Sequence, residues 1–177
     1  MIKRIDFSDA AKKMAEIGFN PATPGSDLPW NTGALIYDFE NETSGASLFG
    51  IARFVRSLIA NDTKSVILLS ELRVWPSEHD VLLIDSVLTS YVGLKYLPPD
   101  GTFLYCNGGD GEKVATICHL AILFGWEISI WLSCPRTQVD ISHDGRISVF
   151  LSEGVEESCR TCVDISGGRI PKVIVER

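Results

Sequence analysis

The chain has 177 residues, of which 45% are apolar and 22% charged, so its size and composition are those of one globular domain. Its 16 basic and 23 acidic residues give a formal net charge of −7, which disfavours non-specific nucleic-acid binding because that binding depends on Lys and Arg at phosphates. No apolar run has the roughly 18 residues that a membrane span needs, and residues 1–7 lack the apolar stretch of a signal peptide. We therefore expect a cytoplasmic protein without membrane contact.

The N-terminal residues predict a helix and a loop. Ser8 is the expected N-cap of a helix over residues 9–17, and Gly18 ends it. Three prolines and a glycine make Asn20–Pro29 a loop. We expect residues 1–177 to form a single domain, in which residues 1–30 provide an N-terminal helix and a Pro-rich arm.

Strands and helices alternate through the middle of the chain. Apolar residues recur at helical spacing in two segments, and the strands are short runs rich in β-branched and aromatic residues. The expected elements are a strand over Ala34–Phe39, a helix over Ala46–Ala60, a buried strand over Ser65–Ser70, a helix capped by Ser77 that runs from Glu78 to about Tyr91 and ends at Gly93, and a strand over Thr102–Tyr105.

The C-terminal part predicts a helix followed by a β-hairpin. An apolar helix over Ala115–Phe124 precedes a strand over Glu127–Leu132. Two further strands, Thr137–Ser142 and Arg146–Ser152, flank a turn at residues 143–145 whose Asp-Gly pair is typical of hairpins. Weaker strand patterns follow at 161–165 and 172–175. The predicted fold class is α+β, a mostly antiparallel sheet packed with about four helices.

The five cysteines are an odd number in a chain without a secretion signal, so we expect reduced thiols. Cys159 and Cys162 have C-x-x-C spacing, which suits half of a metal site or a redox pair. Acidic residues precede this pair and would raise a thiol pKa. The alternative to inert thiols is a zinc-binding or thiol-dependent enzyme built on Cys159, Cys162, Cys134 and His143. The main expectation is that the protein has no cofactor.

Two motifs that suggest catalysis are better explained as local structure. Residues 142–144 contain Ser, His and Asp, but consecutive residues cannot converge as a triad, and a turn is expected instead. The glycine-rich residues 107–111 lack the Lys-Ser/Thr ending of a phosphate-binding loop. Asp110 and Glu112 would also repel a phosphate. We therefore expect no catalytic residue.

A partner-binding surface is predicted near the first internal strand. The alternating carboxylates of Asp38, Glu40 and Glu42 suit a basic partner, a divalent cation, or a solvated edge protected by charge. Trp30 and Trp75 each lie next to a proline or a loop and are candidate interface anchors.

Several short motifs in the second half occur in a recognisable order. These motifs are Trp75–Glu78, Pro99–Phe103, Phe124–Glu127 and Ser142–Asp144. The string resembles a loosely defined group of small bacterial proteins with the order W-P-S-E, P-G-x-x-F, F-G-W-[DE], S-H-D-E. The resemblance covers about residues 75–150. The chain departs from the pattern where Asp100 separates Pro99 from Gly101, and where Gly145 replaces the Glu.

The resemblance implies a function without a catalytic residue. Small acidic proteins of this kind recur as immunity partners of secreted polymorphic toxins. We therefore expect a non-enzymatic immunity protein that occludes the active site of a basic toxin domain, and the sequence leaves its oligomeric state open.

Overall fold

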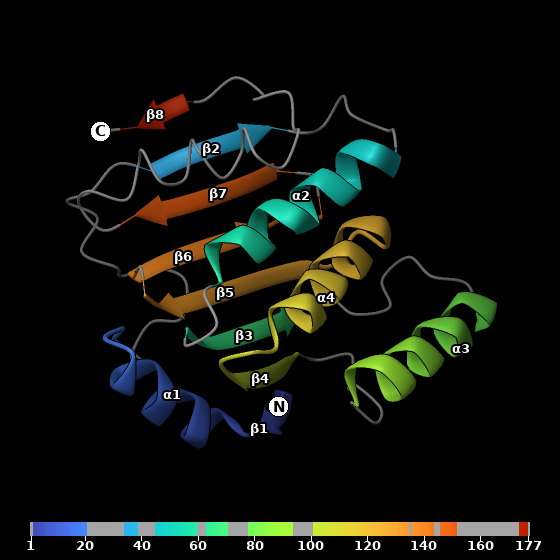
Figure 1. The fold of residues 1–177 in the computed structure, drawn as a ribbon, viewed down its shortest axis with the longest axis horizontal. Coiled ribbons are helices and arrows are strands. Elements are labelled where there is room, and N and C mark those ends of the chain that lie inside the picture. Colours follow the sequence, from blue (N-terminus) through green and yellow to red (C-terminus); the bar gives the residue numbers. More distant parts are fainter. Residues whose placement is uncertain are drawn as a thin grey trace.

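The computed structural model describes residues 2–20, 34–38, 45–59, 63–70, 78–93, 101–134, 136–143, 146–151 and 174–176. Within these ranges, eight strands form one sheet in the order β1-β4-β3-β5-β6-β7-β2-β8, and neighbouring strands are antiparallel throughout (Figure 1).

The strands are β1 (Ile2–Ile5), β2 (Ala34–Asp38), β3 (Lys64–Ser70), β4 (Thr102–Asn107), β5 (Glu127–Ser133), β6 (Arg136–Ile141), β7 (Arg146–Leu151) and β8 (Ile174–Glu176). The helices are α1 (Phe7–Glu16), α2 (Gly45–Leu58), α3 (Glu78–Val87) and α4 (Gly111–Leu123), and a π-helical turn, η1 (Leu88–Val92), directly follows α3. The described helices include none that is long and apolar enough to cross a membrane.

Strands β3 and β5 lie in the interior of the sheet and are covered on both faces. Successive side chains of a strand point to opposite faces. Ile67 and Ile130 therefore belong to the large core under α2 and α4, while Val66 and Trp131 belong to a second core under α1. All four side chains are at most 1% exposed. This double coverage explains the nearly continuous apolar sequence of both strands.

Helices α2 and α4 pack together across one face of the sheet, and α3 lies beyond α4 at the periphery (Figure 1). An ion pair joins the two central helices, because Arg56 Nε on α2 lies 2.9 Å from Glu112 Oε1 on α4. Gly111 makes room for this crossing, since a Cβ there would lie 2.8 Å from Arg56 Nε. The glycine-rich loop before α4 therefore leads into a helix–helix contact.

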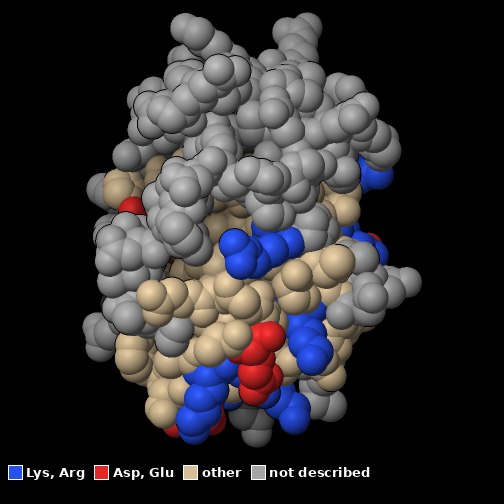
Figure 2. Space-filling model, turned by 90° about the vertical axis from the view of Figure 1, so that its left-hand side faces the viewer, with Lys and Arg blue, Asp and Glu red and all other residues tan. Residues whose placement is uncertain are grey.

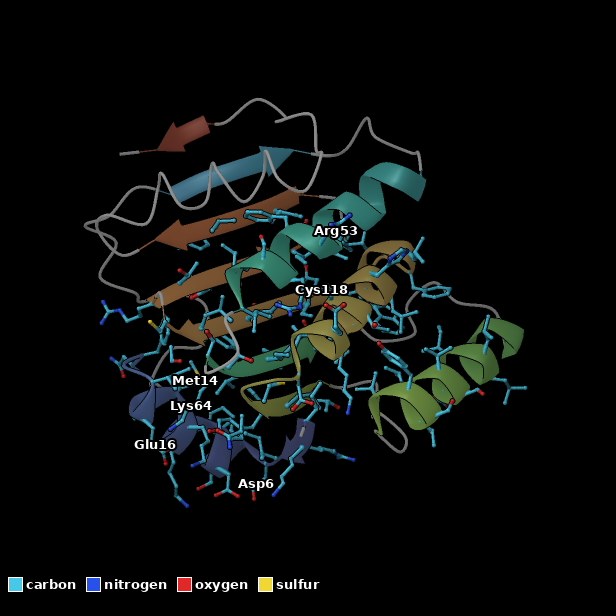
Figure 3. The ribbon with its side chains drawn as sticks, in the orientation of Figure 1. Asp6, Met14, Glu16, Arg53, Lys64 and Cys118 are labelled. Carbon is cyan, nitrogen blue, oxygen red and sulfur yellow. The ribbon has the colours of Figure 1, made fainter. Side chains whose placement is uncertain are left out.

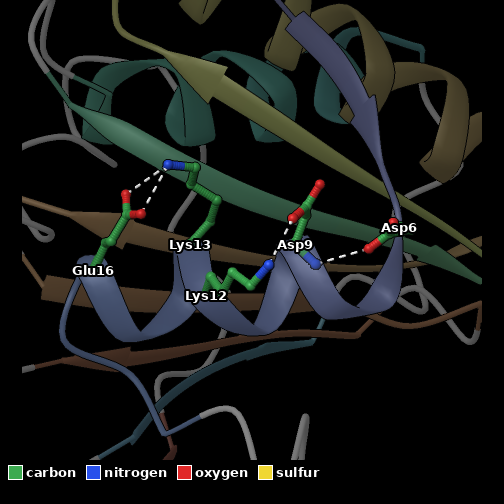
Figure 4. A network of polar contacts seen from close by, with 5 residues as sticks. All are labelled: Asp6, Asp9, Lys12, Lys13 and Glu16. Carbon is green, nitrogen blue, oxygen red and sulfur yellow. Dashed lines mark hydrogen bonds and ion pairs between the residues drawn. The ribbon is translucent and has the colours of Figure 1, made fainter.

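Helix α1 covers the opposite face of the sheet, over β3, β4 and β5. Its buried residues Ala10 and Met14 pack in the same cluster as Val66 and Trp131. On its solvent side, Lys12 pairs with Asp9 at 3.3 Å and Lys13 pairs with Glu16 at 2.7 Å (Figure 4). The solvent side of this helix therefore carries charges of both signs, joined in two ion pairs.

The start of α1 and the strand before it differ from expectation. The helix begins at Phe7, and its N-cap is Asp6, whose Oδ1 accepts a hydrogen bond of 2.8 Å from Asp9 N. Ser8, the expected cap, lies inside the first turn. Strand β1 was not expected, because its two isoleucines are three residues apart and give no period-two pattern. Strand β1 pairs with β4 at the edge of the sheet, and α1 packs on one face of it. The Pro-rich residues 21–30 lie outside the described ranges.

The expected α+β class, with an antiparallel sheet and four helices, is confirmed for the described residues. Strands β6 and β7 pair as the predicted hairpin, although Asp144 and Gly145 of its turn lie outside the described residues. The expected strand at 161–165 also lies outside them, and the last predicted strand is observed as β8, which begins at Ile174.

Candidate functional site

The structure places only part of the predicted partner-binding surface. Asp38 is the last residue of β2, and its backbone lies opposite Arg146 of β7. Trp30, Glu40, Glu42 and Trp75 lie outside the described residues. Their role in binding therefore stays a prediction from the sequence.

The cysteines that the structure describes differ in their exposure. Cys106 on β4 and Cys118 on α4 are buried. Figure 3 shows the position of Cys118 on α4. Burial raises the pKa of Cys106 to about 12, and burial also raises the pKa of Cys118. The thiolate is the reactive form, so burial suppresses the reactive form of both thiols at neutral pH. Cys134, in contrast, is exposed.

Two members of the alternative metal set, Cys134 and His143, lie far apart. Cys134 precedes β6 and His143 follows it, so the six residues of this strand separate the two side chains. At about 3.3 Å per residue, the ends of β6 lie roughly 20 Å apart. Zinc binds sulfur and nitrogen at about 2.0–2.3 Å, and one ion therefore cannot bind both residues. Cys159 and Cys162 lie outside the described residues, and the described part of the chain contains no group of three potential ligands.

A network of polar side chains, not foreseen from the sequence, lies on the α1-facing side of β5 and β6. Trp131 Nε1 donates a hydrogen bond of 2.9 Å to Gln138 Oε1. Gln138 Nε2 donates one of 2.7 Å to Asp140 Oδ2. The antiparallel register creates this chain, because Trp131 is opposite Gln138 and Ser129 is opposite Asp140. We call Glu127, Ser129, Trp131, Gln138, Asp140 and His143 the polar network.

The electrostatic centre of the polar network is Asp140. Burial raises the pKa of its carboxyl above the ordinary value of 3.8. Hydrogen bonding with Ser129 and Gln138 lowers the pKa, and the carboxylate of Glu127 raises it. Burial is the largest of these effects, so the ionised form of Asp140 costs free energy in the folded protein.

His143 is held at the edge of the polar network. Its Nδ1 lies 3.0 Å from Glu127 Oε1, across the end of the β5–β6 pair. The sequence led us to expect only a turn at residues 142–144. The observed carboxylate partner is sixteen residues away in the sequence, and sequence spacing alone does not reveal such a contact.

A second unforeseen feature is the apolar outer face of α3 and η1. Leu82, Leu83 and Tyr91 are 70%, 61% and 53% exposed. The same segment buries Ile84 and Leu88, each at most 5% exposed, in the core that α2 and α4 share. The segment is therefore apolar on two sides, only one of which contacts the rest of the described structure.

The π-helical turn explains how the buried side of this segment continues. Ile84, Leu88 and Val92 follow one another at intervals of four residues and are all buried. Such a row drifts around an α-helix of 3.6 residues per turn, whereas the wider π turn keeps its last members facing the core. Gly93 ends the segment as predicted, with φ of 81° and a hydrogen bond from its N–H to Leu88 O.

The described helices also differ in charge. Helices α1 and α4 are neutral, because each has as many basic as acidic residues, and α2 carries two arginines and no acid. The segment of α3 and η1 contains Glu78, Asp80 and Asp85 and no Lys or Arg. On the side of the molecule shown in Figure 2, by contrast, basic side chains surround acidic ones. Among the described helices, α3 is therefore the one whose sequence has more acidic than basic residues.

The chain matches none of the family models, curated proteins or solved structures with which it was compared.

The raised pKa of Asp140 predicts that ionisation of its carboxyl lowers the free energy of unfolding as pH rises. The folded protein holds the Asp140 proton more tightly than the unfolded chain, because its pKa is raised. The associated stability is therefore present at low pH and is lost as pH rises from near 3.8 through the raised pKa of the folded state. Asp140→Asn removes this loss, so the free energy of unfolding of the variant should rise relative to wild type across that window and then level off.

Urea unfolding in steps of pH measures this difference. Asp9→Asn, which removes an exposed carboxylate from α1, is the control for the loss of one negative charge. If the two variants follow the same course with pH, burial does not set the pKa of Asp140.

The different exposure of the cysteines predicts which of them react with a thiol reagent in the folded protein. In the folded protein, Cys134→Ala should lower the number of thiols that react rapidly with an aromatic disulfide reagent by one. Cys106→Ala and Cys118→Ala should leave the number unchanged, because both thiols are buried with raised pKa values. All five thiols of the wild type should react in denaturant. A rapid reaction lost with Cys106 or Cys118 would contradict the structure.

Proposed function

We propose that the protein is a non-enzymatic binding protein of the immunity class, which neutralises a cognate bacterial toxin by occluding its active site. The observation that carries the proposal is the outer face of α3, where two leucines and a tyrosine are more than half exposed. Large apolar side chains grouped on a surface mark sites of interaction. In this proposal the protein acts in the cytoplasm of the cell that makes the toxin.

The charge of the protein supports a basic partner. The net charge of −7 favours encounter with a positively charged cleft, because complementary potentials raise association rates. Enzymes that act on anionic substrates have such clefts, and an acidic protein seated there excludes the substrate. This mechanism requires an acidic surface with apolar anchors and no catalytic residue.

The residues predicted from the sequence fit the same proposal. Trp75 precedes the first residue of α3, Glu78, by only three positions in the chain. Trp30, Asp38, Glu40 and Glu42 complete the predicted contact set. The zinc- or thiol-dependent alternative is weaker, because Cys134 and His143 lie at opposite ends of β6, and it is kept as an outcome of the test.

The direct test is affinity capture of the tagged protein from its native host, read by mass spectrometry, with the products of adjacent genes in the search. We expect one stoichiometric partner with a toxin-like C-terminal domain. Co-expression of our protein should also abolish the toxicity of that domain. Capture of no partner, together with stoichiometric zinc in protein purified without chelator, would overturn the proposal in favour of the metal-binding alternative.

A further inference from the structure

We draw no further inference here: the strongest candidate, the apolar outer side of α3 and η1 formed by Leu82, Leu83 and Tyr91, already carries the proposed function, and nothing in the described structure shows what covers it.

Discussion

The constraint on which the structure depends is the burial of both faces of the central strands. Ile67 and Ile130 need the cover of α2 and α4, and Val66 and Trp131 need the cover of α1. Buried apolar surface provides most of the favourable free energy of folding, so these helices are held in place by the strands that they cover. The antiparallel connections then set which polar residues share a face with Trp131. The polar network on β5 and β6 is a direct consequence of that register.

The same constraint leaves α3 in a different position from the other helices. It contributes Ile84 to the large core and continues into the π turn through Leu88, but its outer side faces away from the sheet. A helix held by one side presents a rigid surface on the other, which lowers the entropic cost of binding. The polar network and the outer side of α3 are thus different in kind. The polar network runs from the buried Trp131 and Gln138 to the partly exposed Glu127 and His143, whereas the outer side of α3 is an exposed apolar surface.

The sequence predicted the elements better than the sites. Long periodic segments such as α2 and α4 were found because apolar spacing directly reflects burial. Strand β1 was missed because four residues carry too little pattern. Gln138 and Asp140 alternate with Val139 and Ile141, a pattern that is typical of a strand with one face in solvent. The structure nevertheless buries Gln138 and most of Asp140. Leu82 and Leu83 belong to an apolar run, and only the packing shows which members of that run stay exposed.

The central claim is that α3 binds through one side and packs through the other. Hydrogen–deuterium exchange of the protein alone and with its captured partner tests this most directly. The account predicts that peptides covering residues 78–93 gain protection on binding, while peptides from β5 and β6 are unchanged, because bound segments exchange more slowly. Protection confined to β5 and β6, with no change in residues 78–93, would contradict it.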